Sequence, residues 1–414
     1  MSRILVYKNI DIKNKSNYKT MAETFSKKYG VDCPNFGNKL WYQGIISEVS
    51  TEENVITYYN NSFTSDYINS NFDIMLYPMA NIFSIEFSKG LDPITDFIKR
   101  LNIPVYIISC GVQCDSYDDL NGLVNEIGEI SNRFIRAVYH SGGDFALRGY
   151  FSAEFFQKLG YNDLNVVGCP SLFQCGPDLR VEKNNVSIKK FKVAVNGKSE
   201  IALPILKNCD SVFYDQDVLF DILYNTKTYL PINSSVKENI RWLKSSGFGF
   251  YLTDLIIEDR IRLLSDMWDW QHSLQNEGFC FSFGTRIHGN IMAILSGVPS
   301  LIVNVDSRVK EMAEFYDIPS VDYSDALKQV SNKESLYKLY EKTDYSKFNS
   351  KYNEKYNAFN DFLIKKGIVK NMNINNPFLN CSDGNYPKCA TDEAKQRAKK
   401  IRKYSFLYKA LLRL

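Results

Sequence analysis

Residues 280–303 read CFSFGTRIHGNIMAILSGVPSLIV and place a short polar cluster between two apolar runs. Residues 280–283 form a short apolar run that ends at a glycine, which predicts a buried parallel strand, and residues 300–303 have the same character. Between them, residues 291–295 predict a helix and residues 297–299 predict a turn. A strand, a helix and a second strand in this order predict one unit of a parallel α/β sheet.

The polar cluster follows the first of these strands and contains Arg286 and His288, one of only three histidines in the chain. In open α/β sheets, ligands bind at the carboxyl ends of the strands, beside the amino termini of the following helices. Helix amides and an arginine both attract negative charge at such a place. The cluster therefore predicts a site for an anion, most simply a phosphate or a carboxylate, although a histidine after a strand is also commonly a packing or capping residue.

Residues 284–303 resemble the carboxyl-terminal signature of the polysaccharide pyruvyl transferase family, in which Arg-x-His precedes a small residue, a helix, Gly-hydrophobic-Pro and a strand. Weaker matches lie upstream in the family's order, at residues 35–41 (NFGNKLW), 103–114 (IPVYIISCGVQC) and 145–173. Two places depart from the family pattern. Cys169 precedes a proline where the family commonly has aspartate, and the segment PMAN stands where many members have two glycines.

The alternation of strands and helices, together with this resemblance, implies an α/β protein of two doubly wound Rossmann-like domains facing a cleft. This GT-B-like arrangement would be followed by a helical tail. We predict an amino-terminal domain over residues 1–178 on the acceptor side and a carboxyl-terminal domain over 179–345 on the donor side. Residues 346–414 form the tail, with a basic amphipathic end. The strands predicted outside the signature are 3–7, 72–76, 105–110, 145–147, 166–167, 191–195 and 212–214.

The resemblance implies an enzyme that transfers pyruvate from phosphoenolpyruvate, as a ketal, to a sugar of a cell-surface polysaccharide (a capsule or exopolysaccharide) or of its precursor. Arg286 suits the donor because a guanidinium can hold a phosphate or carboxylate bidentately. His288 is the predicted general acid or base, since it titrates near neutral pH. Arg148 lies in the run that resembles the family's Arg-x-x-x-Ser/Thr motif and is the predicted second donor arginine.

The remaining predicted substrate contacts come from the same turns. For the donor phosphate they are Thr285, Gly289 and Asn290, and for the acceptor sugar they are Asn35, Gly37 and Asn38. The scheme requires no metal, and no cofactor besides phosphoenolpyruvate as the donor substrate.

Two alternatives remain open at this stage. A GT-B nucleotide-sugar glycosyltransferase would hold a diphosphate with the same arginine, and would use a late carboxylate such as Glu311 or Glu314 for a ribose. A non-catalytic glycan-binding relative would be expected to lack the pair Arg286 and His288, and both are present.

Composition restricts the partners and the compartment. A formal net charge of +3 over 414 residues is too small to predict a nucleic-acid partner. Nine cysteines without paired metal spacing, and no recognisable secretion signal or membrane span, predict a cytoplasmic protein. Residues 395–414 mix basic and apolar side chains, which predicts a peripheral contact with the inner face of the membrane, consistent with a lipid-linked acceptor. A solvated helix or a partner contact would explain this segment equally well.

Overall fold

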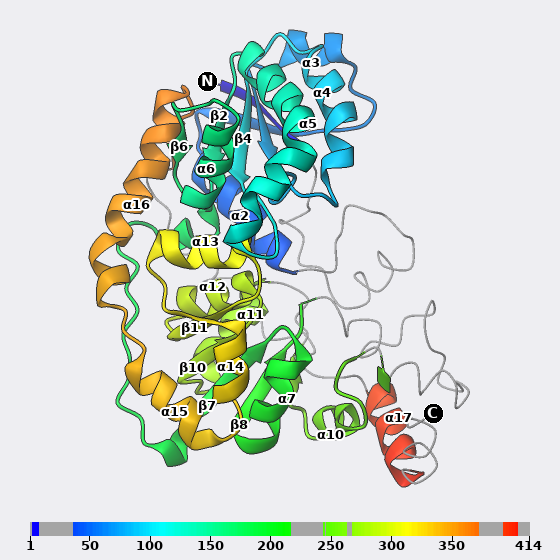
Figure 1. Cartoon of the computed structure of the whole chain (residues 1–414), viewed down its shortest axis with the longest axis vertical. Coiled ribbons are helices and arrows are strands. Elements are labelled where there is room, and N and C mark those ends of the chain that lie inside the picture. The colour runs from blue at the N-terminus through cyan, green and yellow to red at the C-terminus, as the bar shows by residue number, and fades with distance from the viewer. Residues whose placement is uncertain are drawn as a thin grey trace.

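The computed structural model describes residues 2–7, 36–216, 243–244, 246–262, 267–371 and 392–404. Within these ranges the strands form two separate parallel sheets of six strands each, one in each half of the molecule (Figure 1). The first sheet has the order β2-β1-β3-β4-β5-β6. Its strands are β1 (Ser2–Val6), β2 (Asn54–Tyr58), β3 (Ile74–Pro78), β4 (Val105–Cys110), β5 (Asp144–Leu147) and β6 (Asn165–Val166).

The second sheet has the order β12-β11-β10-β7-β8-β9. Its strands are β7 (Lys192–Asn196), β8 (Asp210–Tyr214), β9 (Ile261–Arg262), β10 (Phe281–Gly284), β11 (Ser300–Asn304) and β12 (Ser320–Asp322). Each sheet reverses its strand order once, between β1 and β3 in the first and between β7 and β10 in the second. Such reversals open a crevice at the carboxyl ends of the strands, where α/β proteins bind ligands.

Helices cover the sheets. In the first half they are α2 (Phe36–Val49), α3 (Ser65–Asn71), α4 (Leu91–Ile98), α5 (Leu120–His140) and α6 (Tyr150–Lys158). In the second half they are α7 (Ser199–Asn208), α10 (Tyr251–Ile257), α11 (Met267–Asn276), α12 (Ile287–Leu295), α13 (Ser307–Tyr316), α14 (Tyr323–Gln329) and α15 (Lys333–Lys342). Two more follow, α16 (Ser346–Lys365) and α17 (Asp392–Lys403).

The apolar runs explain why these strands form. Every residue of β3, β4 and β10 is buried, as expected where helices cover both faces of a parallel sheet. Each predicted strand overlaps an observed one, and the predicted fold class of two doubly wound α/β halves with a helical carboxyl-terminal region is confirmed. The sequence did not predict β2, an edge strand whose Val55 is 45% exposed, because its apolar residues form no continuous buried run.

One predicted boundary needs correction at the signature. The helix predicted from residue 291 begins at Ile287, so His288 lies in the first helical turn and Arg286 occupies the N-cap position without a side-chain cap hydrogen bond. Ile287 is buried with the apolar face of α12. Because its burial stabilises the first helical turn, the helix begins closer to β10 than predicted.

Two helices of the second half join it to the first. Ser307, the first residue of α13, donates its amide to the Cys114 carbonyl and accepts from the Cys114 amide through its hydroxyl. The Tyr316 hydroxyl at the other end of α13 bonds to both backbone groups of Cys169. Helix α16 runs along both halves (Figure 1), and Lys366 at its end pairs with Asp144 at 2.5 Å. The sheets are therefore held in a fixed relation on one side of the molecule.

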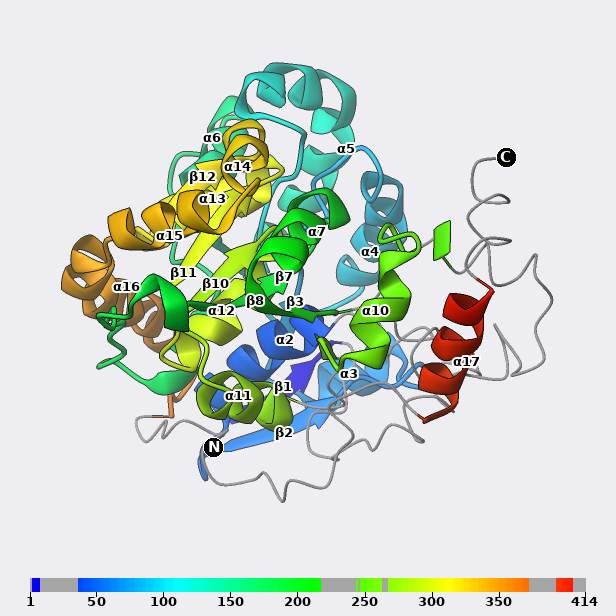
Figure 2. The ribbon, with the colours of Figure 1, turned by 90° about the horizontal axis from the view of Figure 1, so that it is seen from below.

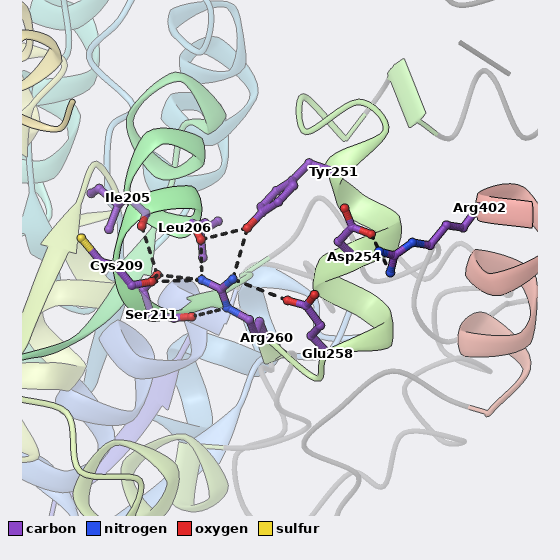
Figure 3. A network of polar contacts seen from close by, with 9 residues as sticks. All are labelled: Ile205, Leu206, Cys209, Ser211, Tyr251, Asp254, Glu258, Arg260 and Arg402. Atoms are coloured by element: carbon purple, nitrogen blue, oxygen red, sulfur yellow. Dashed lines mark hydrogen bonds and ion pairs between the residues drawn. The ribbon is translucent and has the colours of Figure 1, made fainter. Parts of the chain in front are cut away.

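Helix α17 lies beside α10, on the opposite side of the molecule from α16 (Figure 2). Its apolar residues Ala398 and Ile401 are fully buried, and Arg402 pairs with Asp254 of α10 at 3.0 Å (Figure 3). Helix α10 is held in turn by Arg260, which bonds to the Tyr251 hydroxyl and to the backbone of α7 at Leu206. The apolar face predicted for membrane contact is thus used inside the protein over residues 392–404, and residues 405–414 lie outside the described ranges.

Candidate active site

A cleft of about 540 Å³ lies between the carboxyl ends of the strands of the two sheets. The second half contributes the turns after β7, β8, β10 and β11, and the first half contributes residues that follow β1, β3 and β5. The cleft therefore spans the reversal points of both sheets, where ligand sites are expected. Of the residues predicted from sequence, those that line it are Asn38, Arg148, Thr285, Arg286 and His288.

The turn before α12 is built around a pair of buried asparagines. Asn196, at the end of β7, accepts a hydrogen bond from the Arg286 amide at 2.9 Å and donates to the Asn290 side chain at 3.2 Å. Asn290 also accepts from the Ser282 hydroxyl and donates to the Gly284 carbonyl. These bonds cross-link β7, β10 and α12, and they fix the place at which Arg286 leaves the sheet.

These contacts change the role predicted for two residues. Asn290 is fully buried and its carboxamide bonds within the protein, so it positions the turn and does not line the cleft. Gly289 is absent from the cleft lining as well. A side chain there would place its Cβ 2.5 Å from Gln216 Nε2, so close packing accounts for the glycine.

Thr285 joins the turns that follow β7 and β10. Its hydroxyl accepts a hydrogen bond from the Lys198 amide at 2.9 Å. Gly197 makes this approach possible, because its φ of +89° and the closeness of the Thr285 side chain leave no room for a Cβ. Thr285 therefore lies in the cleft wall with its oxygen already used as an acceptor.

Arg148 enters the cleft from the first half, directly after β5, and only 1% of it is exposed. Its Nε donates to the Ser109 hydroxyl at 3.1 Å, and its amide donates to the Cys110 carbonyl. Ser109 has φ +62° at an irregularity of β4, a conformation that is costly for a residue other than glycine. A Cβ on Gly111 would lie 2.9 Å from Arg148 Cδ, so the predicted glycine turn makes space for this arginine.

Arg308, in the first turn of α13, is a third arginine in the cleft and was not predicted. Its guanidinium pairs with Asp306 at 3.1 Å. The signal that identified Arg286, a basic residue soon after a buried strand and before a helix, applies here too. The resemblance predicted only a short family helix here, over residues 309–316, which begins one residue after Arg308.

Some buried polar atoms of the cleft have no hydrogen-bond partner among the described residues. Among the described residues, Arg148 Nη2, Arg308 Nε and His288 Nε2 are buried and have no hydrogen-bond partner. Buried polar atoms in folded proteins are nearly always satisfied, by the protein, by water or by a ligand. Two cationic groups and an imidazole that line one cleft with unused positions can bind an anion.

The electrostatics explain the state of the histidine. Burial and the neighbouring cations Arg148 and Arg308 hold the pKa of His288 well below its ordinary value. The imidazole is therefore neutral at neutral pH. An anion bound against the arginines would offset their charge and raise that pKa again.

The carboxylates that would have favoured a nucleotide-sugar enzyme lie elsewhere. Neither Glu311 nor Glu314 lines the cleft. Glu311 is buried and accepts hydrogen bonds from the amide and hydroxyl of Ser152, so it caps α6 of the first half, and burial raises its pKa to about 7. Glu314 accepts from the Tyr117 hydroxyl at 2.8 Å. Both side chains therefore make hydrogen bonds between the two halves of the protein.

The three residues predicted to contact the acceptor sugar differ in whether they line the cleft. Asn38 lines the cleft, Gly37 is buried and does not, and Asn35 lies outside the described residues. The structure adds polar lining residues that were not predicted: Asn81, Lys198, Ser199, Glu200, Asp215, Gln216 and Asp306. No group of three or more metal-binding side chains occurs in the part of the chain that the structure describes.

Comparison with known proteins yields one family. The model described as polysaccharide pyruvyl transferase matches residues 53–307, which is more than half of the chain. The match includes Arg148, Arg286 and His288 and ends one residue before Arg308. No curated protein matches the chain.

Similar solved structures include the Staphylococcus aureus MnaA–UDP co-structure, with 11% identity, a TM-score of 0.34, and coverage of 99% of this chain and 98% of that one. Another is a putative UDP-N-acetylglucosamine 2-epimerase from Listeria monocytogenes, with 11% identity, a TM-score of 0.39, and coverage of 88% and 96%. Likenesses this distant carry no argument about function.

Proposed function

The chain belongs to the polysaccharide pyruvyl transferase family, and from this premise we propose that it transfers pyruvate from phosphoenolpyruvate to a sugar of a cell-surface polysaccharide or of its precursor. The observation that carries the donor assignment is the convergence of three unused buried atoms, on Arg148, Arg308 and His288, in one cleft. Phosphoenolpyruvate carries a phosphate and a carboxylate on one carbon. A set of guanidinium groups on opposite walls suits two oxyanions held close together.

Arg286 adds to this donor site from the amino terminus of α12. The helix begins at Ile287, so its first amides and its dipole favour an anion at the same place. The pKa of Arg308 is lowered in part by the charges of Arg148 and Arg286, and all three residues line the same cleft, which supports one anionic ligand bound among them. Asp306 offsets the charge of Arg308, so the three arginines keep a net positive charge that the donor would help to neutralise.

The proposed reaction makes and breaks bonds at C2 and C3 of the donor. The methylene carbon takes up one proton, an oxygen of the first sugar hydroxyl bonds to C2, and the bond from C2 to the phosphate oxygen breaks. The oxygen of a second hydroxyl then closes the ketal. Of the two protons that the hydroxyls lose, one balances the proton gained by the methylene carbon and the other leaves with the phosphate.

His288 is the proposed proton carrier in this sequence. Burial and two arginines lower its pKa, so the imidazole is neutral before the donor binds. The negative charge of the bound donor favours the protonated form, which can deliver its proton to the methylene carbon, and the neutral imidazole that results can then accept a hydroxyl proton. This alternation assigns both acid and base roles to one residue.

Calorimetric titration with phosphoenolpyruvate tests the donor assignment. We expect saturable binding by the wild type, and a loss of about tenfold or more in affinity in Arg286→Ala and Arg308→Ala. Arg133→Ala is the matched control, because Arg133 lies on the exposed surface of α5 and pairs with Asp92. Binding of UDP or UDP-N-acetylglucosamine without any binding of phosphoenolpyruvate would move the protein to the nucleotide-sugar glycosyltransferases.

We also propose that the basic end contacts an anionic membrane surface, where a lipid-linked acceptor would be found. No described helix is long and apolar enough to cross a bilayer. Helix α17 exposes Lys399, Lys400 and Lys403 while its apolar residues are buried, so contact through this helix would be electrostatic. Sedimentation with vesicles tests it: we expect binding to anionic vesicles that a triple Lys→Gln variant loses, and binding to neutral vesicles would contradict the electrostatic origin.

A further inference from the structure

The cleft changes its chemical character along the second sheet. The strand order β11-β10-β7-β8 arranges the carboxyl ends of these strands in that sequence along one wall. Arg308 follows β11 and Arg286 follows β10, whereas Glu200 follows β7, and Asp215 and Gln216 follow β8. One section of the cleft therefore has a net positive charge, because Asp306 offsets only one of its arginines, and the adjoining section presents two carboxylates and a carboxamide.

Gln216 lies where the two sections meet. It is 3% exposed and lines the cleft, and among the described residues its Nε2 has no hydrogen-bond partner. The same nitrogen occupies the space left by the missing side chain of Gly289, next to His288 on α12. A buried amide donor without a partner is costly, and a ligand hydroxyl would satisfy it.

The walls of this section are built for a small polar molecule. The rings of Phe213 and Phe248 pack edge to face with their centroids 4.9 Å apart, and both residues line the cleft. Gly247 approaches Ser199 so closely that a Cβ would lie 2.3 Å from the serine hydroxyl. Lys198 belongs to the same turn, but its ammonium lies over the Tyr323 ring at 4.9 Å. Apolar rings with a few placed polar groups are typical of small-molecule sites.

We propose that this acceptor section, defined by Glu200, Asp215 and Gln216, binds the sugar that receives the pyruvate. Carboxylates accept hydrogen bonds from hydroxyl groups, and a carboxamide donates as well as accepts, which suits a neutral molecule with several hydroxyls. The same carboxylates repel the anionic donor and so direct it to the arginines. The inference rests on the proposed function, because it takes the cationic section to be the donor site.

This assignment moves the main acceptor contacts to the second half of the protein. The sequence had predicted them on the acceptor side of the first half, at Asn35, Gly37 and Asn38. Of these, Asn38 lines the cleft, together with Asn81 after β3, so the first half closes the wall opposite the acceptor section. A sugar held there would present its hydroxyls beside His288 and the donor.

The experiment measures donor and acceptor binding separately on the full-length protein. Calorimetry follows phosphoenolpyruvate, and saturation-transfer NMR follows the methyl glycosides of glucose, galactose, mannose and N-acetylglucosamine. The test variants are Gln216→Ala, the nearly isosteric Gln216→Met, and Asp215→Asn, which keeps the shape of the side chain. Gln157→Ala, on the exposed surface of α6, is the control for Gln216, and Arg308→Ala is the control for the donor section.

We expect at least one glycoside to bind the wild type, and its affinity to fall about tenfold or more in each Gln216 variant. Phosphoenolpyruvate should bind those variants like the wild type, and Arg308→Ala should show the opposite pattern. Glycoside binding that survives all three test variants, or no glycoside binding to a protein that does bind phosphoenolpyruvate, would overturn the acceptor section alone. If phosphoenolpyruvate does not bind the wild type, the proposed function fails and the acceptor section fails with it.

Discussion

Arg148 and Arg286 occupy equivalent places in the two halves, since each follows a strand and precedes a helix at the cleft. The protein supports them differently. The Arg148 side chain is buried and fixed through its guanidinium, by Ser109. Arg286 is fixed through its backbone amide, by Asn196, and its side chain is less buried. The comparison indicates that the first half supplies a rigid, buried guanidinium, whereas the second half supplies a rigid turn from which a less buried guanidinium extends.

Replacing each arginine by lysine should give the largest difference between the two halves, measured as the loss of phosphoenolpyruvate affinity. Arg148→Lys loses the Nε–Ser109 bond and the planar fork in a closed space, so we expect phosphoenolpyruvate affinity to fall roughly 100-fold or more. Arg286→Lys keeps a charge on a less buried side chain, and a loss of about tenfold is expected. Calorimetry measures both, with circular dichroism as the check on folding. Equal losses would show that the two supports do not differ in function.

The rigid turn can be tested through its backbone bond. Asn196→Ala removes the acceptor of the Arg286 amide and one partner of the buried Asn290, so the free energy of unfolding should fall by about 1–3 kcal/mol. Denaturant unfolding measures this change, and Asn162→Ala, at an exposed position after α6, is the control. A variant as stable as the wild type would mean that packing alone holds the turn.

The rigid guanidinium can be tested through Ser109. Its positive φ costs roughly 1–2 kcal/mol for a residue with a Cβ, so Ser109→Gly relieves strain while it removes the hydroxyl. We expect the free energy of unfolding to stay within about 1 kcal/mol of the wild type. The KM for phosphoenolpyruvate should rise about fivefold to tenfold, because Arg148 loses the hydrogen bond that positions it. Ser109→Ala keeps the strain and should be the less stable of the two. An unchanged KM in both variants would contradict the positioning role.

The smallest expected effect concerns protons. The pKa of His288 is lowered in the folded protein, so between that lowered value and about pH 6.5 the unfolded chain binds more protons than the folded protein. The free energy of unfolding therefore falls as the pH is lowered through this window, and its pH dependence through His288 ends above about pH 6.5. Phosphoenolpyruvate should reverse the shift and bind with proton uptake. Calorimetry in buffers of different ionisation enthalpy measures the uptake, and His288→Asn should abolish it. Binding without uptake at any pH would leave His288 outside the donor site.

Local sequence patterns predicted those strands and site residues whose structure depends on residues close together in the chain. The strands around residues 280–303 and the position of Arg286 follow from an apolar run, a glycine and a polar cluster, all close together in the chain. Arg148 was found through a resemblance, and Arg308 was missed although it has the same strand-end position. In such cases the signal is present in the sequence and only its interpretation was incomplete.

Other parts of the site depend on contacts between distant segments. Asn290 was predicted to bind phosphate, but its role comes from Asn196, which is 94 positions away in the chain. The support of Arg148 by Ser109 depends on an irregularity in β4 that no local pattern indicates. Gln216 faces the cleft because Gly289 leaves room for it. Such pairings are set by the packing of the sheets, and only the folded structure reveals them.

A crystal structure of the full-length protein with phosphoenolpyruvate bound would test the central claim most directly. The account predicts that the phosphate and the carboxylate contact Arg148, Arg286 and Arg308, with His288 close to the methylene carbon and the acceptor section open. Phosphoenolpyruvate bound away from these arginines, or beside Glu200 and Asp215, would contradict it.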